Sequence, residues 1–343
     1  MLYGESPLIT VGVVVRNREW IIGKMLNALL SQTYPHDKIY VLIVDGNSSD
    51  KTVEITEKIL EKGDFKGYKI IVKECSIPEG RNLCIDNMQG DALLSWDSDV
   101  IMDSDAVSLM VKAMIENKAD IVDVKCVEIF VNSIEDAEVK IKQAKSMQNQ
   151  SGAAIHVVSV TGMGHTLVAK AVFNNLRFDP DLTVCEDLDF SYRAGKKGYK
   201  MIALGHVLTF DVNMWKKGYS DTHIDMPLKY AVRGIRKKAE IQVLTYNTKI
   251  TAKVTISFFL KNKRYLFYLG YAPAVFLTIC GLFLYMPLTL AFPSYLLAFA
   301  IWQIRKRGFT RGLQSTLRSI LIGVPYASWL VFYSIKNAWS DAK

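Results

Sequence analysis

Acidic side chains stand at the ends of short apolar runs in this 343-residue chain. Asp45 follows the run 41–44, Asp97-Ser98-Asp99 follows the run 92–95, and the pair Glu186-Asp187 opens a helix-like segment. Carboxylates hold a phosphate only through a divalent cation, and alternate residues of an extended chain point to the same side. Asp97 and Asp99 are therefore suited to Mg²⁺ or Mn²⁺.

Two common nucleotide-binding patterns are absent. A dinucleotide-binding fold needs G-x-G-x-x-G after its first strand, but residues 15–19 read Val-Arg-Asn-Arg-Glu. The sequence also has no G-x-x-x-x-G-K-[ST] phosphate loop. A phosphate-bearing ligand would have to be held through the acidic positions instead.

Further landmarks accompany these acids over residues 8–212. They are, in chain order, Arg16-Asn17 after the first apolar run, the turn Asp45-Gly46-Asn47-Ser48-Ser49-Asp50-Lys51-Thr52, Gly80-Arg81-Asn82, Asp97-Ser98-Asp99, and Glu186-Asp187-Leu188-Asp189-Phe190 with Arg193 and Gly198. Together they resemble the motifs of the family 2 glycosyltransferases, which have the GT-A fold. The resemblance implies an enzyme whose donor is a nucleotide sugar.

The resemblance also implies roles for these residues. Asp187 is expected to be the general base that takes the acceptor proton, with Glu186 orienting it or shifting its pKa by like charge. If the acceptor is a lipid phosphate, Asp187 is expected to position it instead. The pair would also cap the helix that follows. The expected donor-binding residues are Val14, Arg16, Asp45, Arg81, Asp97 and Ser98.

Two of the donor residues have simpler alternatives. Asp45 is expected to accept hydrogen bonds from a nucleobase, and the alternative is an Asx turn before the next helix, for which Asp50 is the better cap. Arg81 is expected to face the diphosphate, because a guanidinium binds phosphate oxygens bidentately. Its alternative is a surface arginine on a helix.

The expected metal ligands are Asp97, Asp99 and Asp211, with Mn²⁺ or Mg²⁺ as the cofactor. By resemblance, Asp97 would hold the ribose or a water on the cation, and Asp99 would bind the cation that bridges the two phosphates. A later strand supplies a further ligand in many members of the family. His206 lies too early for the usual spacing, so Asp211 is favoured.

Four residues are expected on the acceptor side. Gly162 belongs to a glycine-rich turn, 161–165, whose backbone can approach a sugar closely. Trp215 would stack on a sugar or anchor the chain at a membrane interface. Arg233 and Arg236 would receive a lipid phosphate or contact anionic lipids.

The first 224 residues alternate between strand-like and helix-like segments. Helices are expected over 20–31 and 49–61. This alternation predicts an α/β domain with a mostly parallel sheet, and the resemblance makes it a GT-A, Rossmann-like nucleotide-sugar domain. The expected strands are Ile9–Val15, Val41–Val44, Lys69–Val72, Ala92–Ser95 and Ile121–Val127.

Basic charge is concentrated in the last third of the chain. Residues 225–343 hold 17 Lys and Arg against 3 Asp and Glu, and residues 265–304 carry no charge at all. A membrane span needs about 20 apolar residues, and basic flanks favour the cytoplasmic side. The expected organisation is a cytoplasmic domain (1–224), basic amphipathic helices at the membrane interface (225–262), and a membrane domain (263–343). Its expected transmembrane helices are 265–285, 287–304 and 313–335.

The N-terminus has no basic region, and Arg16 and Arg18 make its apolar stretch too short for a signal peptide. The catalytic domain is therefore expected in the cytoplasm, tied to an integral membrane segment. The five scattered cysteines have no zinc-binding spacing and are expected to be free thiols. The basic tail brackets an apolar stretch, which favours a lipid bilayer and excludes nucleic acid as the partner.

These features predict an inverting, metal-dependent transfer to a lipid-linked acceptor at the membrane. The favoured donor is GDP-mannose, chosen by analogy, and the favoured acceptor is polyprenyl or dolichyl phosphate. The alternative is transfer from a UDP-sugar to a hydroxyl of a glycolipid or lipid-linked glycan. The polymerases of the family carry Q-x-x-R-W, which is absent, so a single transfer is favoured. An inactive membrane-anchored nucleotide-binding scaffold is the non-enzyme alternative.

Overall fold

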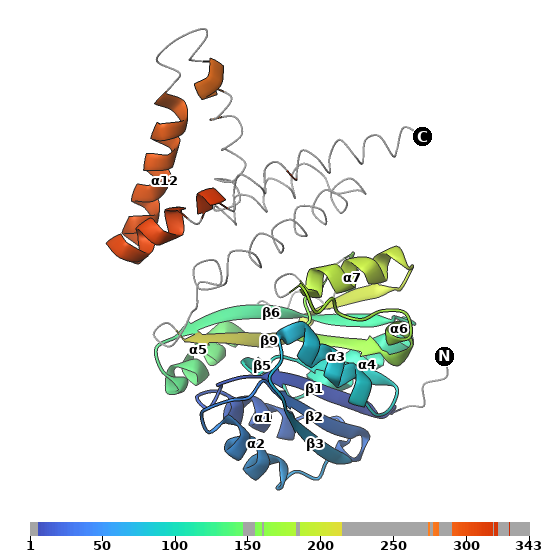
Figure 1. The fold of residues 1–343 in the computed structure, drawn as a ribbon. Helices are drawn as coiled ribbons and strands as arrows, with labels where there is room; N and C mark the ends of the chain where they lie inside the picture. Colours follow the sequence, from blue (N-terminus) through green and yellow to red (C-terminus); the bar gives the residue numbers. More distant parts are fainter. Residues whose placement is uncertain are drawn as a thin grey trace, which may run out of the picture. The chain divides into compact units, whose positions relative to one another are not determined.

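The computed structural model describes residues 6–146, 155–159, 161–182, 186–214, 274, 277–280, 290–317, 319–321 and 329, although the side chains of 206–208 and 307 are outside the description. The chain divides into two compact units, residues 1–219 and 220–343. Each unit is described by itself (Figure 1).

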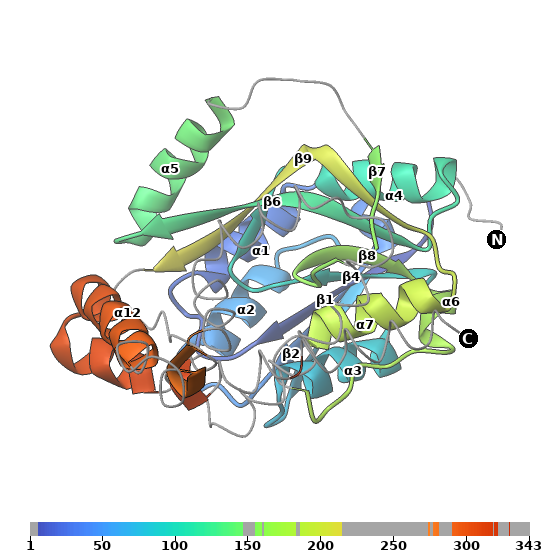
Figure 2. The same ribbon diagram turned by 90° about the horizontal axis from the view of Figure 1, so that it is seen from above.

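The first unit is built on one mixed sheet (Figures 1 and 2). Its first half is parallel, in the order β3 (Gly67–Val72), β2 (Ile39–Asp45), β1 (Ile9–Val15) and β4 (Ala92–Trp96). All seven residues of β2 are buried, and β1 is nearly as deeply buried. Strands covered on both faces read as continuous apolar runs, which is why the sequence revealed them.

The second half of the sheet mixes strand directions. β8 (His165–Ala169) runs antiparallel to both β4 and β6 (Ile121–Val131), and β6 runs parallel to β9 (Met201–Met214). Two three-residue strands, β5 (Val100–Met102) and β7 (Ile155–Val157), pair antiparallel with β9. The sheet is therefore less parallel than expected, with as many antiparallel as parallel pairings among the described strands.

Helices cover the sheet on both faces. Along the sheet, the chain moves in one direction from β1 to β2 and on to β3, and in the opposite direction from β3 to β4. Because such connections are right-handed, α1 and α2 lie on one face of the sheet and α3 lies on the other. α1 packs on α2, α3 packs on β1 and β2, and α4 packs on β6. Their bounds, with those of the remaining helices of this unit, are α1 (Ile22–Leu30), η1 (His36–Lys38), α2 (Thr52–Leu60), α3 (Ile77–Asn87), α4 (Ala106–Glu116), α5 (Ile134–Ser146), α6 (Lys170–Phe173) and α7 (Glu186–Lys196).

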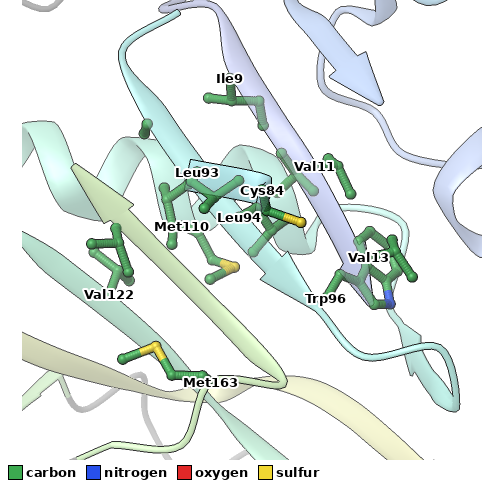
Figure 3. Close-up of a cluster of buried hydrophobic side chains, with 14 of the residues drawn as sticks. Ile9, Val11, Val13, Cys84, Leu93, Leu94, Trp96, Met110, Val122 and Met163 are labelled. Carbon is green, nitrogen blue, oxygen red and sulfur yellow. The ribbon is translucent and has the colours of Figure 1, made fainter. Parts of the chain in front are cut away.

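The core lies between the sheet and these helices. Figure 3 shows side chains of β1 and β4 meeting those of α3 and α4, among them Val13, Cys84, Leu93 and Met110. Trp96 closes this core at the carboxyl end of β4, where its indole N–H donates to the carbonyl of Val100 at 2.8 Å. The packed strands thereby fix the turn that carries Asp97 and Asp99.

The second unit is described mainly through α12 (Ala291–Arg307), which ends at Gly308 with a φ of 80°. Residues 309–317 are also helical. Within the part of the chain that the structure describes, no helix has both the length and the apolar character needed to cross a membrane. Most of the predicted spans 265–285 and 313–335 lie outside the described residues, as do the predicted interface helices.

Candidate active site

The expected base-binding residues lie together at the carboxyl ends of β1 and β2. A Cβ added to Gly80 would lie 2.7 Å from Cγ1 of Val14, and one added to Gly46 would lie 3.4 Å from Cβ of Arg16 and 3.6 Å from the carbonyl oxygen of Cys75. These glycines let the start of α3 approach the strand ends. The segment around Cys75 thus borders the same site, and sequence reasoning had not included it.

The carboxylate of Asp45 bonds within its own loop, to Ser48 three residues on, and does not cap α2. Its side chain is fully buried. One carboxylate oxygen accepts the backbone N–H of Ser48 and the other accepts the Ser48 hydroxyl, both at 2.6 Å. A role for Asp45 toward a nucleobase stays a prediction.

Side chains tie the loop after β1 to the loop after β2. Asn17, with a φ of 52°, accepts the backbone N–H of Ser49 at 2.8 Å, and Arg18 donates its backbone N–H to the Thr52 hydroxyl at 2.8 Å. Asp50 accepts the backbone N–H of Thr52 at 3.0 Å, which places it at the start of α2 as expected. These motif residues fix the shape of the two loops that border the site.

Arg81 lies inside the protein rather than on a helix surface. It is 6% exposed, and its guanidinium pairs with Glu186 at 2.5 Å and with Asp97 at 3.4 Å. The guanidinium also lies over the ring of Phe178, 5.6 Å from the centroid. Arg81 therefore links α3 to both acidic motifs, and contact with a diphosphate stays a prediction.

Glu186 and Asp187 begin α7 in a buried setting. Burial raises the pKa of Glu186 to about 7, and the guanidinium of Arg81 opposes this rise. Burial also raises the pKa of Asp187, again opposed by Arg81, and one carboxylate oxygen accepts the N–H of Leu188 at 2.7 Å. A carboxylate with a raised pKa is a stronger base than an ordinary aspartate.

Three further carboxylates are close enough to repel one another. Burial raises the pKa of Asp99, and the charge of Asp97 adds to it. Burial and the charges of Asp99 and Asp97 raise the pKa of Asp211 to about 7. Asp211 reaches this place because its strand, β9, pairs with β5 directly after the Asp97–Asp99 turn, with Asp211 opposite Val100.

This acid set fits a divalent cation that arrives with a diphosphate. Among the described residues, no three His, Cys, Asp or Glu side chains are gathered as a ready-made metal site, so the expected set of Asp97, Asp99 and Asp211 is not preassembled. Mg²⁺ commonly takes only one or two protein carboxylates and completes its shell with substrate phosphates and water. The excess negative charge at Asp99 and Asp211 is what such a cation would neutralise.

A glycine loop separates the two acidic groups. The carbonyl of Gly164 accepts the N–H of Asp97 at 2.8 Å, and a Cβ on Gly164 would lie 2.5 Å from a carboxylate oxygen of Asp97. A Cβ on Gly162 would lie 3.8 Å from a carboxylate oxygen of Asp187. The loop 162–164 therefore contacts Asp97 at one end and faces Asp187 at the other.

A largely buried ion pair supports this loop, and no pattern in the sequence pointed to it. His165 meets the carboxylate of Asp123 at 2.8 Å, and the Thr166 hydroxyl contacts both Asp123, at 3.1 Å, and the carbonyl of Gly162, at 2.8 Å. Burial alone would lower the pKa of His165, but hydrogen bonds with Asp123 and Cys126 outweigh it and raise that pKa to about 10.

Several expected residues cannot be placed. Trp215, Arg233 and Arg236 lie outside the described residues, and so does the side chain of His206. Ser98 is buried within the Asp97–Asp99 turn. Sequence reasoning missed the importance of Arg18, whose Nε lies 3.6 Å from Asp99.

Comparison with known proteins identifies the class of this domain. Residues 10–172 match the family model described as glycosyl transferase family 2. The matched segment holds β1 to β4, the Asp97–Asp99 turn and the glycine loop, and Asp187 follows it. The match covers just under half of the chain and supports a glycosyltransferase with a segment similar to family 2.

Curated relatives are also glycosyltransferases. The chain is 24% identical over 201 residues to a beta-monoglucosyldiacylglycerol synthase from Trichormus variabilis, which covers 56% of this chain and 42% of the relative. It is 23% identical over 206 residues to a dolichyl N-acetyl-alpha-D-glucosaminyl phosphate 3-beta-D-2,3-diacetamido-2,3-dideoxy-beta-D-glucuronosyltransferase from Methanococcus voltae, covering 56% and 63%. The chain thus spans less than two thirds of either relative.

Two solved structures share the fold. The mannosyltransferase PcManGT from Pyrobaculum calidifontis, in complex with GDP-Man and Mn²⁺, has a TM-score of 0.51 at 19% identity and covers 98% of this chain and 88% of its own. Residues 1–349 of Staphylococcus aureus TarS, in complex with UDP-GlcNAc, have a TM-score of 0.51 at 16% identity and cover 95% and 91%. At these identities, the likeness establishes the GT-A fold and nothing finer.

Proposed function

We propose that this protein is an inverting, metal-dependent glycosyltransferase that moves one sugar from a nucleotide donor to a lipid-linked acceptor. The observation that carries the proposal is the glycine loop 162–164, which contacts the carboxylate of Asp97 and faces that of Asp187. The donor-side acid Asp97 and the acceptor-side acid Asp187 thus lie at the two ends of one short loop. A sugar bound along this loop would have a carboxylate at each end.

The chemistry follows from this arrangement. The acceptor oxygen bonds to the anomeric carbon, and the bond from that carbon to the phosphate oxygen of the donor breaks on the opposite face. Asp187 takes the proton when the acceptor is a hydroxyl, and positions the acceptor when it is an anionic phosphate. Arg81 keeps Glu186 and Asp97 in place through its buried pairs. Asp99 and Asp211 would hold a divalent cation, which when bound offsets the charge of the leaving nucleoside diphosphate.

The lipid acceptor is supported by sequence and by the names of relatives. One relative is a synthase of monoglucosyldiacylglycerol, and the name of another contains a dolichyl phosphate-linked sugar. The basic segment 225–262 and the uncharged run 265–304 suit a chain whose catalytic domain works at the cytoplasmic face of a membrane. Polyprenyl or dolichyl phosphate with GDP-mannose is the first pair to test.

Asp187 favours a second candidate, transfer from a UDP-sugar to a hydroxyl of a glycolipid or lipid-linked glycan. A phosphate acceptor is already anionic and needs no base, whereas a hydroxyl does. The raised pKa of the partly buried Asp187 suits the hydroxyl.

The deciding experiment measures transfer from radiolabelled GDP- and UDP-sugars to polyprenyl phosphate in detergent, with Mn²⁺ and with a chelator. Label that enters the organic phase from one donor, and only with metal, supports the lipid-phosphate transferase and names its sugar. Donor hydrolysis without lipid product moves the acceptor to a glycolipid or glycan. No metal-dependent turnover of any donor refutes the proposal.

Asp187→Asn then separates the two acceptor classes. We expect a loss of at least about 100-fold in kcat with a hydroxyl acceptor, because general base catalysis is removed, and a loss below about 10-fold with a phosphate acceptor. Asp181→Asn, at an exposed loop position, is the matched charge control.

A further inference from the structure

Arg18 stands beside the predicted metal ligand Asp99. Its Nε lies 3.6 Å from a carboxylate oxygen of Asp99, an ion-pair distance too long for a hydrogen bond. That Nε is buried and has no hydrogen-bond partner, although 40% of the side chain remains exposed. The backbone N–H of Arg18 is fixed to Thr52, so the side chain extends from an anchored position.

Asp99 lies among other acidic side chains. Asp97, Asp211 and, beyond it, Glu128 bring negative charge to the same place. Among the described residues, Arg18 is the one basic side chain within 4 Å of Asp99. Its guanidinium therefore supplies positive charge where a divalent cation would also be attracted.

We propose that Arg18 and the divalent cation compete for Asp99, and that a nucleoside diphosphate relieves this competition by offering the guanidinium a phosphate partner. Two cations cannot share one carboxylate without repelling each other. A guanidinium with an unused donor and a partly exposed side chain is suited to phosphate oxygens. Metal and nucleotide thus bind cooperatively, and Arg18 is the positioning residue that couples them.

This inference rests on the proposed function, since it assumes that metal and nucleotide meet at Asp99. It is tested on the full chain in detergent by measuring free Mn²⁺ from its electron paramagnetic resonance signal, without nucleotide and with GDP or UDP. Without nucleotide, Arg18→Gln is expected to bind Mn²⁺ about tenfold more tightly than wild type. Nucleotide should then increase the Mn²⁺ affinity of this variant about tenfold less than it does in wild type, a change within the range of ordinary coupling. Lys24→Gln, which removes an exposed pair with Glu138, should change neither.

The two possible failures are distinguishable. If wild-type protein binds Mn²⁺ in the presence of nucleotide and Arg18→Gln leaves both affinities unchanged, the role of Arg18 is refuted while the proposed metal dependence stands. If wild-type protein binds no Mn²⁺ with either nucleotide, both are refuted. Arg18→Lys keeps the positive charge but loses the planar set of guanidinium donors. Its affinity for Mn²⁺ without nucleotide should therefore stay as weak as that of wild type. Near-ultraviolet circular dichroism checks that each variant is folded.

Discussion

At the scale of single residues, Arg81 joins the two acidic motifs of the site. Its guanidinium is buried between Glu186 and Asp97, which come from two different acidic motifs. Removing one partner of a buried ion pair leaves the other charges without compensation. The arginine thus belongs to the stability of the domain as well as to its chemistry.

Arg81→Met is expected to lower the free energy of unfolding by about 3–5 kcal/mol, because Glu186 and Asp97 lose their buried partner. Urea unfolding of the full chain, followed by circular dichroism, measures the change. Lys112→Met is the control, since its pair with Glu116 is well exposed and contributes less than about 1 kcal/mol. Equal effects of the two variants would show that Arg81 has no such structural role.

The two loop glycines offer a matched pair of substitutions. Gly164→Ala would place a methyl group 2.5 Å from the Asp97 carboxylate, which must move, whereas Gly162→Ala would make an ordinary 3.8 Å contact with Asp187. A displacement of about 1 Å at a reacting group can cost about 100-fold in rate. We therefore expect a loss of that order in kcat for Gly164→Ala and less than about 5-fold for Gly162→Ala. Similar kcat values would contradict this geometry.

Spacing and resemblance select Asp97, Asp99 and Asp211 from the sequence, but they do not show how the acids of the site are paired. In the structure the charges of these three residues act on one another, and their binding of a metal stays a prediction. The burial of Arg81 was not predicted, because its partner Glu186 lies 105 positions away and only the fold joins them.

Among the elements, the loops that border the site are held by their own motif side chains. Four of these side chains accept hydrogen bonds from nearby backbone N–H groups: those of Asn17, Ser48, Asp50 and Thr52. Many of the residues that resemble the family 2 motifs therefore determine the shape of these loops.

β1, β2 and β4 were predicted closely because each is a buried apolar run, whereas the partly exposed β3 was predicted only over its last four residues. β5 and β7 were missed since each has only three residues. β8 and the long β9 lack a continuous apolar signal, and the register of β6 against β9 shifts between Val124 and Lys125. Pairings of this kind depend on contacts between distant segments, which local patterns do not reveal.

The pair of His165 and Asp123 should make stability depend on pH. The folded-state pKa of His165, about 10, lies above its ordinary value, so the stabilisation is complete below about pH 6.5 and is lost as pH rises toward 10. The difference in melting temperature between wild type and His165→Gln should shrink over that range. Asp123→Asn should lose the same pH-dependent part, and a difference that stays constant with pH would contradict the ion pair.

At the scale of the whole molecule, the proposed function assigns chemistry and membrane attachment to different units. The unit 1–219 holds every acidic site residue, and the unit 220–343 holds the basic and uncharged segments. Under the proposed function, the first unit binds donor and metal while the second brings the acceptor lipid within reach.

A fragment of residues 1–219 should therefore fold and bind Mn²⁺ with a nucleoside diphosphate, yet lose transfer to lipid acceptors in vesicles. Calorimetry of binding and a vesicle transfer assay measure the two properties. The full chain should sediment with membranes and resist alkaline extraction. Full transfer by the fragment would show that the second unit is not needed for the acceptor.

The indole of Trp96 has a consequence for spectroscopy. It is fully buried, directly precedes Asp97, and its N–H reaches the carbonyl of Val100 across the acidic turn. A ring so placed emits at short wavelength and senses the electric field of the charges beside it. Trp96, one of six tryptophans in the chain, is therefore an optical reporter at the Asp97–Asp99 turn, and its own emission is expected to shift when positive charge arrives there.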